Sequence, residues 1–392
     1  MSHDNHPLPE TALLERIGDR LDSADAADAT GPPDVVATVV AVEGAAYRRP
    51  GAKALFEAGG DGIGAITAGC LEDDLRRATA RVRATGAPRI ETYDLTAEDG
   101  VWGLGLGCNG VVTVLLEPLE AHYRRAVEPV RTRRDVAVCT VLAAEGPLER
   151  GDRAYYLPDE GLFETPGTDV TATGWPTAAV SGPAGEMTSE GRSGVVELSV
   201  GGRRLDVFVE AIPAPPTCLV FGSGPDVAPV VDLASRADFR VVVVGFRGAV
   251  DLEGRFPGAD RTVTTSPRDL QDAVAIDERT HAVVMTHNFV DDRLVLETLL
   301  DSPAPYVGIM GPRKRFEELR AELAADGRPV SEGDLERIYA PIGLDLGLGT
   351  PAGIAQSVVA ELLAVSRDRR PGHLRDRGGP IHDRPRPDDL SG

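Results

Sequence analysis

Alternation of short apolar runs with amphipathic segments in the C-terminal part of the chain restricts the fold more than any other feature. Each run is followed by residues with helical spacing, and the last segment begins at Thr350-Pro351, a pair that suits a helix start. Such alternation is typical of parallel strands that helices cover on both faces. The sequence therefore predicts an α/β domain with a doubly wound parallel sheet over residues 217–366. Its expected strands are 218–221, 240–244, 281–286 and 306–310.

The preceding part of the chain has a different pattern. A β-branched run at 35–42 predicts a buried strand, residues 71–84 have helical spacing, and further strands are expected at 135–142 and 204–210. We interpret residues 35–213 as an α+β domain. The other segments are expected to be an N-terminal helix and linker (1–34), a loop-rich or small β excursion (about 145–195) and a disordered tail (367–392).

The charge balance restricts the partners. The chain has 392 residues and a formal net charge of −21, which argues against nucleic acid because the phosphate backbone would repel the average surface. Lysine occurs only at Lys53 and Lys314, so arginine supplies the other 39 of the 41 basic residues. An acidic, lysine-poor surface is typical of a halophilic protein, because salt screens its self-repulsion. An ordinary acidic protein from a high-GC organism is the alternative.

Neither a membrane segment nor a disulfide framework is expected. No run approaches the roughly 18 consecutive apolar residues of a membrane helix, and the first residues lack the pattern of a signal peptide. The four cysteines are widely spaced and form no close metal-ligand pair. We therefore expect a soluble, cytoplasmic protein.

A glycine-rich turn follows the first strand of the predicted parallel sheet. Gly222, Gly224 and Asp226 lie where a backbone can approach a phosphate at a helix N-terminus. Val227 occupies the third glycine position of the usual dinucleotide motif, and Gly245 stands where such a site presents an acid to the ribose. The pattern predicts a nucleotide-type fold with a phosphate site or, alternatively, a turn needed only for packing.

Two further loops are expected at the same edge of the sheet, because the carboxyl ends of parallel strands gather where ligands bind. His287 and Asn288 follow one strand, and Arg313, Lys314 and Arg315 follow another. Cations are slightly unfavourable at a helix N-terminus, so an anionic ligand or an acidic partner nearby would explain the basic triplet. The alternatives are a solvated basic turn and a histidine that is simply hydrogen-bonded at a strand end.

Two segments of the N-terminal domain place a cysteine beside glycine. The segment 69–72 precedes a predicted helix, whose N-terminal partial charge lowers the pKa of a thiol. The segment Gly103–Gly110 carries little side-chain bulk and suits close approach by a planar ligand. A buried structural cysteine and a flexible loop are the alternatives. The candidate residues here are Gly69, Cys70, Glu72, Gly105, Gly107, Cys108 and Asn109.

Taken in order, these segments resemble the XdhC/CoxI family of accessory factors. The resemblance spans most of the chain except the linker, the excursion and the tail. Ala68, where many relatives carry glycine, and Gly245, where relatives often carry an acid, depart from the pattern. The matching segments are Val39–Ala54, Gly69–Glu72, Gly103–Gly110, Phe221–Asp226, Met285–Asn288, Tyr306–Arg315 and Pro341–Ser357.

The resemblance implies an N-terminal XdhC/CoxI domain and a C-terminal Rossmann-like domain in a protein that protects molybdenum cofactor (molybdopterin) and delivers it to a molybdenum hydroxylase. The client would be of the xanthine dehydrogenase or carbon monoxide dehydrogenase type, and a cysteine desulfurase would be a second partner. A homodimer is the default oligomer. No catalytic residue and no NAD(P) are expected, because the resemblance is to a non-catalytic cofactor chaperone.

The resemblance also implies a set of cofactor-binding residues. Cys70 and Cys108 would be molybdenum or sulfur contacts, because soft thiolates suit such a ligand. The remaining implied residues are Arg49, Gly69, Glu72, Gly105, Gly107, Asn109, Gly222, Gly224, Asp226, His287, Asn288, Arg313, Lys314 and Asp345.

Two other functions stay open. The Rossmann-like half favours an NAD(P)-dependent oxidoreductase, with Arg247 near the second strand suited to the phosphorylated dinucleotide. A scaffold that joins desulfurase and hydroxylase without holding the cofactor would not need Cys70 or Cys108.

Overall fold

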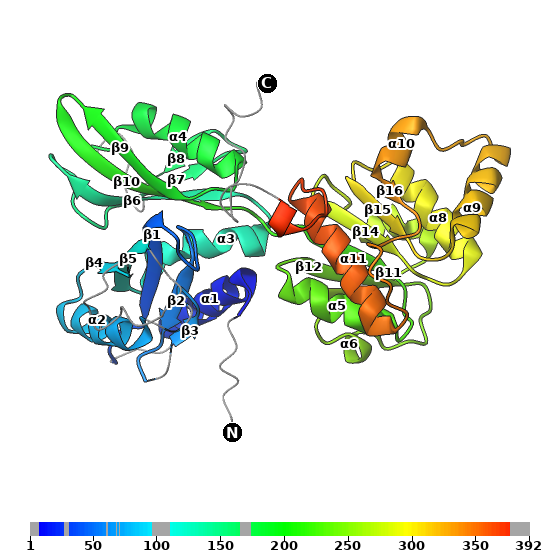
Figure 1. Cartoon of the computed structure of the whole chain (residues 1–392), viewed down its shortest axis with the longest axis horizontal. Helices are drawn as coiled ribbons and strands as arrows, with labels where there is room; N and C mark the ends of the chain where they lie inside the picture. The colour runs from blue at the N-terminus through cyan, green and yellow to red at the C-terminus, as the bar shows by residue number, and fades with distance from the viewer. Residues whose placement is uncertain are drawn as a thin grey trace. The chain divides into compact units, whose positions relative to one another are not determined.

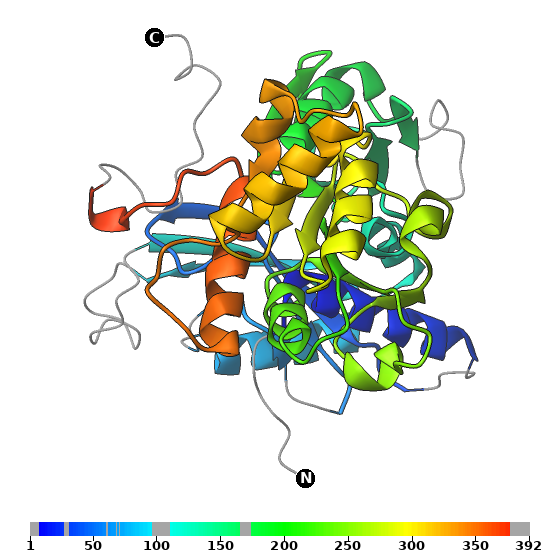
Figure 2. The same cartoon turned by 90° about the vertical axis from the view of Figure 1, so that its right-hand side faces the viewer.

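The computed structural model describes residues 8–26, 31–59, 62–67, 69, 71–95, 110–164 and 174–376. The chain divides into two compact units, Met1–Pro215 (unit 1) and Pro216–Gly392 (unit 2) (Figure 1, Figure 2). Unit 1 is α+β with antiparallel sheets, and unit 2 is α/β with one parallel sheet. The predicted fold class is therefore confirmed.

Unit 1 contains two five-stranded sheets with the same strand order. The first has the order β3-β2-β1-β5-β4 and the second the order β8-β7-β6-β10-β9, so that β1 corresponds to β6 and β5 to β10. A helix precedes the first strand of each sheet, and a second helix joins the third strand to the fourth. The chain therefore contains two copies of one module, repeat 1 (residues 10–118) and repeat 2 (residues 124–212).

The elements of repeat 1 are α1 (Glu10–Ala26), β1 (Val35–Gly44), β2 (Lys53–Phe56), β3 (Gly62–Gly64), α2 (Glu72–Thr85), β4 (Arg89–Asp94) and β5 (Gly110–Pro118). A short 3-10 helix, η1 (Ala121–Tyr123), leads into repeat 2. The elements of repeat 2 are α3 (Arg124–Thr132), β6 (Val136–Ala144), β7 (Arg153–Leu157), β8 (Leu162–Glu164), α4 (Thr177–Ser189), β9 (Gly194–Val200) and β10 (Arg203–Ile212).

The two repeats also share sequence at equivalent positions. Residues 38–44 read Thr-Val-Val-Ala-Val-Glu-Gly, and residues 140–146 read Thr-Val-Leu-Ala-Ala-Glu-Gly at the equivalent place. Gly51-Ala52-Lys53 and Gly151-Asp152-Arg153 then lead into the second strand of each copy. The spacing is 102 residues for the first match and 100 for the second, and similarity at a nearly constant spacing is the usual mark of a structural repeat.

Ion pairs are exchanged across the junction of the repeats. Lys53 of repeat 1 pairs with Glu210 of repeat 2, and Arg153 of repeat 2 pairs with Glu117 of repeat 1. The four side chains are each at most 10% exposed. A buried charge that loses its partner is strongly destabilising, so each repeat depends on the other for its buried cation or anion. Around these pairs an apolar cluster also draws on both repeats, through Val40, Leu115, Leu142 and Phe208.

Removing one member of a buried pair should destabilise unit 1 more than removing both. We expect Lys53→Met to lower the free energy of unfolding by about 3–5 kcal/mol, because Glu210 stays buried without its cation. The double variant Lys53→Met/Glu210→Met should lose much less of this free energy, because no buried charge is left without a partner. Urea denaturation of the full chain measures both, with Arg16→Met as control, since Arg16 and Glu57 form a surface pair whose loss costs under about 1 kcal/mol. Equal losses in the single and double variants would contradict the exchange.

The excursion expected at about 145–195 contains regular elements of repeat 2: β7 and β8 agree with a small β excursion, whereas the helix α4 was not predicted. β7 and β8 lie there, and α4 spans thirteen residues. α4 contains Gly182, Pro183 and Gly185, which lowers its intrinsic helix propensity. Its buried residues Val180 and Ala184 pack into the apolar core over repeat 2, and this tertiary packing outweighs the propensity.

Unit 2 has one sheet of six parallel strands in the order β13-β12-β11-β14-β15-β16. Alternate residues of β11 enter opposite cores: Cys218 and Val220 join the core under α5 and α11, whereas Leu219 and Phe221 join the core under α8 and α9 (Figure 1). The strands are β11 (Thr217–Phe221), β12 (Arg240–Gly245), β13 (Arg261–Thr264), β14 (Thr280–Val284), β15 (Tyr306–Ile309) and β16 (Ile338–Tyr339). The longer helices are α5 (Val227–Arg236), α8 (Phe289–Leu300), α9 (Arg313–Ala325) and α11 (Pro351–Ser366).

The short elements of unit 2 are α6 (Leu252–Arg255), η3 (Pro267–Asp269), α7 (Leu270–Ala273), α10 (Glu332–Arg337) and η4 (Leu374–Asp376). The sequence did not predict α6, α10 and η4. The edge strands β13 and β16 are only partly buried, so they lack the apolar runs that mark the central strands. The expected cap at Thr350 is present, because its hydroxyl accepts from the backbone N–H of Gly353.

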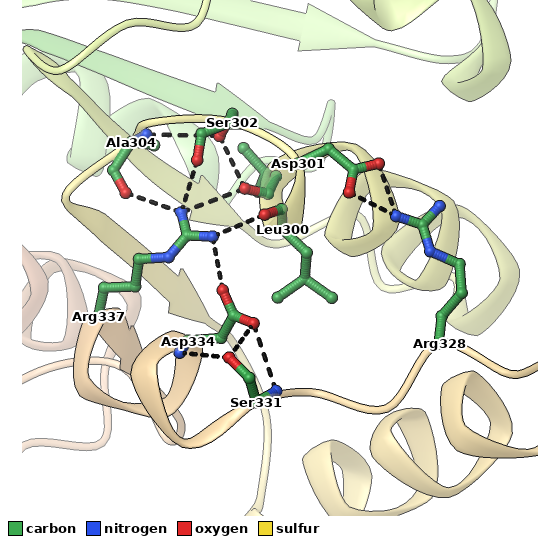
Figure 3. Close-up of polar contacts among 9 residues, drawn as sticks. Leu300, Asp301, Ser302, Ala304, Arg328, Ser331, Asp334 and Arg337 are labelled. Carbon is green, nitrogen blue, oxygen red and sulfur yellow. Dashed lines mark hydrogen bonds and ion pairs between the residues drawn. The ribbon is translucent and has the colours of Figure 1, made fainter.

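Arg337 closes the C-terminal end of α8. Its guanidinium donates to four backbone carbonyls at 2.9–3.2 Å and to Asp334 at 2.8 Å (Figure 3). The last carbonyl groups of a helix have no intrahelical partner, and a planar fork of donors can satisfy several at once. Ser331 and Asp334 form a capping box at the start of α10, which holds Asp334 beside the guanidinium. The four acceptors are Leu299, Leu300, Ser302 and Ala304.

Arg337→Lys should destabilise unit 2 although the charge is kept. An ammonium group cannot reach the same set of carbonyls, so we expect a loss of about 2–4 kcal/mol in the free energy of unfolding. Arg328→Lys is the matched control, because Arg328 pairs with Asp301 at the exposed surface of the same region (Figure 3) and should lose under about 1 kcal/mol. Similar losses in both variants, measured by denaturant titration, would show that the backbone contacts of Arg337 contribute little.

Candidate functional site

The strand order of unit 2 reverses between β11 and β14, and two loops meet at that point. The chain passes from β11 toward β12 on one side and from β14 toward β15 on the other. A Cβ atom on Gly222 would lie 2.7 Å from the carbonyl oxygen of Met285, so only glycine allows the two loops to approach this closely. Ligands of open parallel sheets bind at such a switch point, outside the carboxyl ends of the strands. Gly222, Gly224, Asp226, His287 and Asn288 are therefore brought together as the sequence predicts.

A histidine in a strained backbone conformation projects from this edge. His287 has φ of +59°, in the left-handed region that non-glycine residues seldom adopt. Its Nε2 lies 2.7 Å from Oδ2 of Asp226, which holds the ring in one orientation and leaves Nδ1 for another partner. The imidazole is half exposed. Strain of this kind concentrates at functional sites, so His287 is a central residue of the candidate site.

The helix N-termini at this edge differ in whether they are capped. The side chain of Asn288 accepts from the backbone N–H groups of Val290 and Asp291, so the start of α8 is already satisfied. No side chain in the described ranges caps α5 or α9. At the start of α5, the N–H of Val227 already donates to the carbonyl oxygen of Gly224 and Pro229 has no N–H, so this helix offers an anion little. The start of α9 can offer the N–H groups of Arg313 and Lys314, whereas Asn288 acts as a cap and not as a ligand residue.

The three basic residues at the start of α9 do not all face solvent. Arg313 and Lys314 are exposed. Arg315 turns inward and donates to Oδ2 of Asp292 at 2.6 and 3.1 Å, and its guanidinium lies 5.7 Å from the ring centre of Phe289. Asp292 is 2% exposed and also accepts from the hydroxyl of Thr286 at 2.5 Å. Arg315 therefore joins the loop after β14 to α9, and only Arg313 and Lys314 of the triplet can meet a ligand.

Asp345 lies in an exposed loop after β16 whose start is held by α11. Glu361 of α11 accepts from the hydroxyl of Tyr306 at 2.7 Å and from the N–H of Gly343 at 2.9 Å. Burial, with the nearby carboxylate of Glu361, raises the pKa of Tyr306 well above its usual value, so its hydroxyl stays a donor. The loop thus leaves the edge of the sheet in a defined direction.

The buried acids that shape this edge were not predicted from the sequence. Asp292 and Glu361 each occupy a position on the apolar face of a helix, beside Val295 and Leu296 in α8 and beside Val358 and Leu362 in α11. A carboxylate at an apolar-face position is the signal that could have revealed them, because a buried charge requires a partner.

The predicted residues of unit 1 are only partly described. Arg49 lies in the exposed turn between β1 and β2, and Gly69 has φ of +104° just before α2. Glu72 begins α2, and with Asp73 and Asp74 it places three carboxylates in the first turn, where they offset the partial positive charge of the helix. Cys70, Gly105, Gly107, Cys108 and Asn109 lie outside the described residues.

The two cysteines in the described ranges are structural. Cys139 and Cys218 are buried, and burial raises the pKa of each thiol to about 12, so neither forms a thiolate at neutral pH. Within the part of the chain that the structure covers, no cluster of His, Cys, Asp and Glu has the arrangement of a metal site.

Replacing His287 by glycine should stabilise the fold. We expect His287→Gly to raise the free energy of unfolding by about 0.5–1 kcal/mol, because glycine adopts a left-handed backbone without strain and the exposed contact with Asp226 contributes little. Asp238→Gly is the control, since Asp238 has φ of +63° in the turn between α5 and β12. Urea titrations measure both variants. If His287→Gly lowered the free energy of unfolding while Asp238→Gly raised it, the contact of His287 with Asp226 would outweigh the backbone strain.

Comparisons with known proteins agree with this architecture. Residues 27–94 match the model of the XdhC and CoxI family, and residues 218–362 match the XdhC Rossmann domain. A Bacillus subtilis protein, named as a probable xanthine dehydrogenase subunit, is 31% identical over 339 residues, which cover 85% of this chain and 93% of that protein. An uncharacterized Escherichia coli protein, YqeB, is 27% identical over 44% of this chain and 31% of its own length.

A solved structure is similar over nearly the whole chain. It is described as a xanthine dehydrogenase from Bacillus halodurans, and it matches with a TM-score of 0.70 and 29% identity over 93% of this chain and 97% of that chain. No helix in the described ranges has the length and apolar character needed to cross a membrane. On the similarity of both units and of the full-length relative, the chain belongs to the XdhC and CoxI family.

Proposed function

We propose that this protein is an accessory factor that binds molybdenum cofactor and delivers it, after sulfuration by a cysteine desulfurase, to a molybdenum hydroxylase of the xanthine dehydrogenase or carbon monoxide dehydrogenase type. The names of the Bacillus subtilis relative and of the Bacillus halodurans structure support a xanthine dehydrogenase as the partner. The similarity covers both units, so the proposal concerns the whole chain.

One observation carries the proposal: a site suited to an anion lies on a strongly acidic protein. The chain has a net charge of −21, yet Arg313 and Lys314 lie exposed at the uncapped start of α9, on the sheet edge that carries the loop of Gly222. Uncapped helix starts and cations suit a phosphate group. The terminal phosphate of a molybdopterin has this chemistry, so the described residues fit the cofactor.

The chain's own residues would bind and orient the cofactor. Backbone N–H groups of Arg313 and Lys314 at the start of α9 would donate to phosphate oxygens, and the side chains of the same two residues would neutralise their charge. His287, oriented by Asp226, would contribute a further polar contact through Nδ1. The bound cofactor supplies molybdenum and its sulfur for hydroxylation in the client enzyme. Cys70 and Cys108 remain the proposed molybdenum or sulfur contacts.

Two features of unit 2 support this proposal over an NAD-dependent oxidoreductase. A ribose-binding acid would have to replace Gly245, but a Cβ atom there would already lie 3.0 Å from the side chain of Leu252. Arg247 is 61% exposed nearby and would suit only a dinucleotide with an extra phosphate.

The test is the pterin content of protein made in a host that synthesises molybdenum cofactor. Released pterin is measured by fluorescence after oxidation, at high salt. We expect wild type to hold pterin near stoichiometry and Arg313→Glu/Lys314→Glu to hold at least about tenfold less, because each charge reversal weakens a contact to phosphate. The control Arg236→Glu/Arg320→Glu changes the net charge equally, at the far end of α5 and further along α9.

Three outcomes would contradict parts of the proposal. Folded wild type without pterin would favour the scaffold function. Equal pterin in the two charge-reversed proteins would move the cofactor away from the edge of unit 2. If Cys70→Ala and Cys108→Ala both retained pterin, the proposal that these thiols contact the cofactor would be contradicted.

A further inference from the structure

A small cavity lined by both polar and apolar side chains lies between the two sheets of unit 1, where the repeats exchange their ion pairs. Much of its lining comes from equivalent positions of the two copies, because each threonine stands opposite the corresponding Leu115 or Phe208 in its own sheet. The cavity therefore sits where the two repeats meet face to face. The equivalent lining residues are Thr38 and Thr140, Leu115 and Phe208, and Glu117 and Glu210.

Two residues that line this cavity each have a buried polar atom without a hydrogen-bond partner among the described residues. The atoms are Oε1 of Glu117 and Nε2 of His122. Glu117 is 1% exposed, and its other oxygen accepts from the hydroxyl of Tyr123 at 2.7 Å and from Arg153. An unpaired carboxylate oxygen at this depth is costly, so a partner that the protein does not supply is expected.

Groups of both charge signs surround the cavity. Glu117, Glu210 and Arg153 line it, and Lys53, whose pKa is lowered by burial to about 7, pairs with Glu210. Burial, and then the nearby Arg153, lowers the pKa of His122 to about 3, so its ring is neutral at physiological pH. A further cation would meet Lys53 and Arg153, and a further anion would meet the two glutamates. The missing partner is therefore neutral.

We propose that one ordered water molecule occupies this cavity and bridges Oε1 of Glu117 to Nε2 of His122. The cavity offers about 10 Å³ to the centre of a water molecule, which is room for one. Water can donate to the carboxylate and then either donate to or accept from the imidazole, so it fits both neutral tautomers. The hydroxyls of Thr38 and Thr140 line the same space and can complete its coordination.

This water would bind at only one of the two equivalent ion pairs, the pair that contains Glu117. His122 and Tyr123 belong to η1, which links the repeats, and the hydroxyl of Tyr123 donates to Glu117. Glu117 consequently has two protein donors on one oxygen and a second oxygen that is free, whereas the equivalent Glu210 is paired with Lys53. The bound water offsets this asymmetry, because it gives the free oxygen of Glu117 a donor.

A crystal structure of the full chain at high resolution tests the site directly, with potassium in the crystals replaced by rubidium. We expect one density peak within about 2.6–3.2 Å of both Glu117 Oε1 and His122 Nε2, without anomalous signal. An empty cavity would overturn the proposal. Anomalous scattering at the peak would do the same, because it would identify a monovalent cation in place of water.

A matched pair of variants tests the bridge in solution. His122→Gln keeps a polar group that can hold the water, and His122→Leu has a similar volume without one. We expect His122→Leu to lower the Tm by about 3–8 °C relative to His122→Gln and to lose one long-lived water in magnetic relaxation dispersion. Equal Tm values and equal water counts in the two variants would overturn the bridge.

Discussion

The buried exchange of Lys53–Glu210 and Arg153–Glu117 is the constraint on which unit 1 depends. Each repeat buries a cation that only the other repeat can neutralise, and a buried charge without a partner costs several kcal/mol. Hydrophobic burial alone would allow the two sheets to pack in several relative positions, because it is non-directional. The ion pairs remove that freedom, since each demands one alignment of strands from different copies. Unit 1 thus combines an apolar core with a polar junction that specifies its geometry.

Unit 2 uses buried charges for a different purpose. Asp292 joins Arg315 to the loop after β14, Glu361 holds the loop that leads to Asp345, and Arg337 closes the end of α8. These groups are satisfied within the protein, so they are not available to a ligand. Their effect is to hold the loops at the carboxyl edge of the sheet in place. By contrast, Arg313 and Lys314 are exposed, and His287 has a strained backbone. The proposed function rests on these three residues.

The sequence predicted the parallel sheet well and the first 215 residues less completely. Central strands such as 217–221 and 280–284 are buried on both faces, so they are continuous apolar runs that a sequence reveals directly. α4 was missed because its glycines and proline suggest a loop, and only packing against β6 and β10 makes it helical. The repeat could have been found from the shared Glu-Gly segments ending at Gly44 and Gly146. Of the candidate site, the loops were predicted, but the inward turn of Arg315 and the capping role of Asn288 were not.

The sequence by itself determined the central strands and the longer helices of unit 2, the glycine-rich turn that follows β11, and the cations that follow Met310. These properties depend on neighbouring residues and on the period of apolar side chains, which are local. Only the tertiary structure decided which charges are buried, which cations stay exposed and which polar atoms lack a partner. Those outcomes depend on contacts such as Lys53 with Glu210 and Arg315 with Asp292, whose members are distant in the chain. The energy of a charge is set by the solvent and partners around it, and folding alone brings these together.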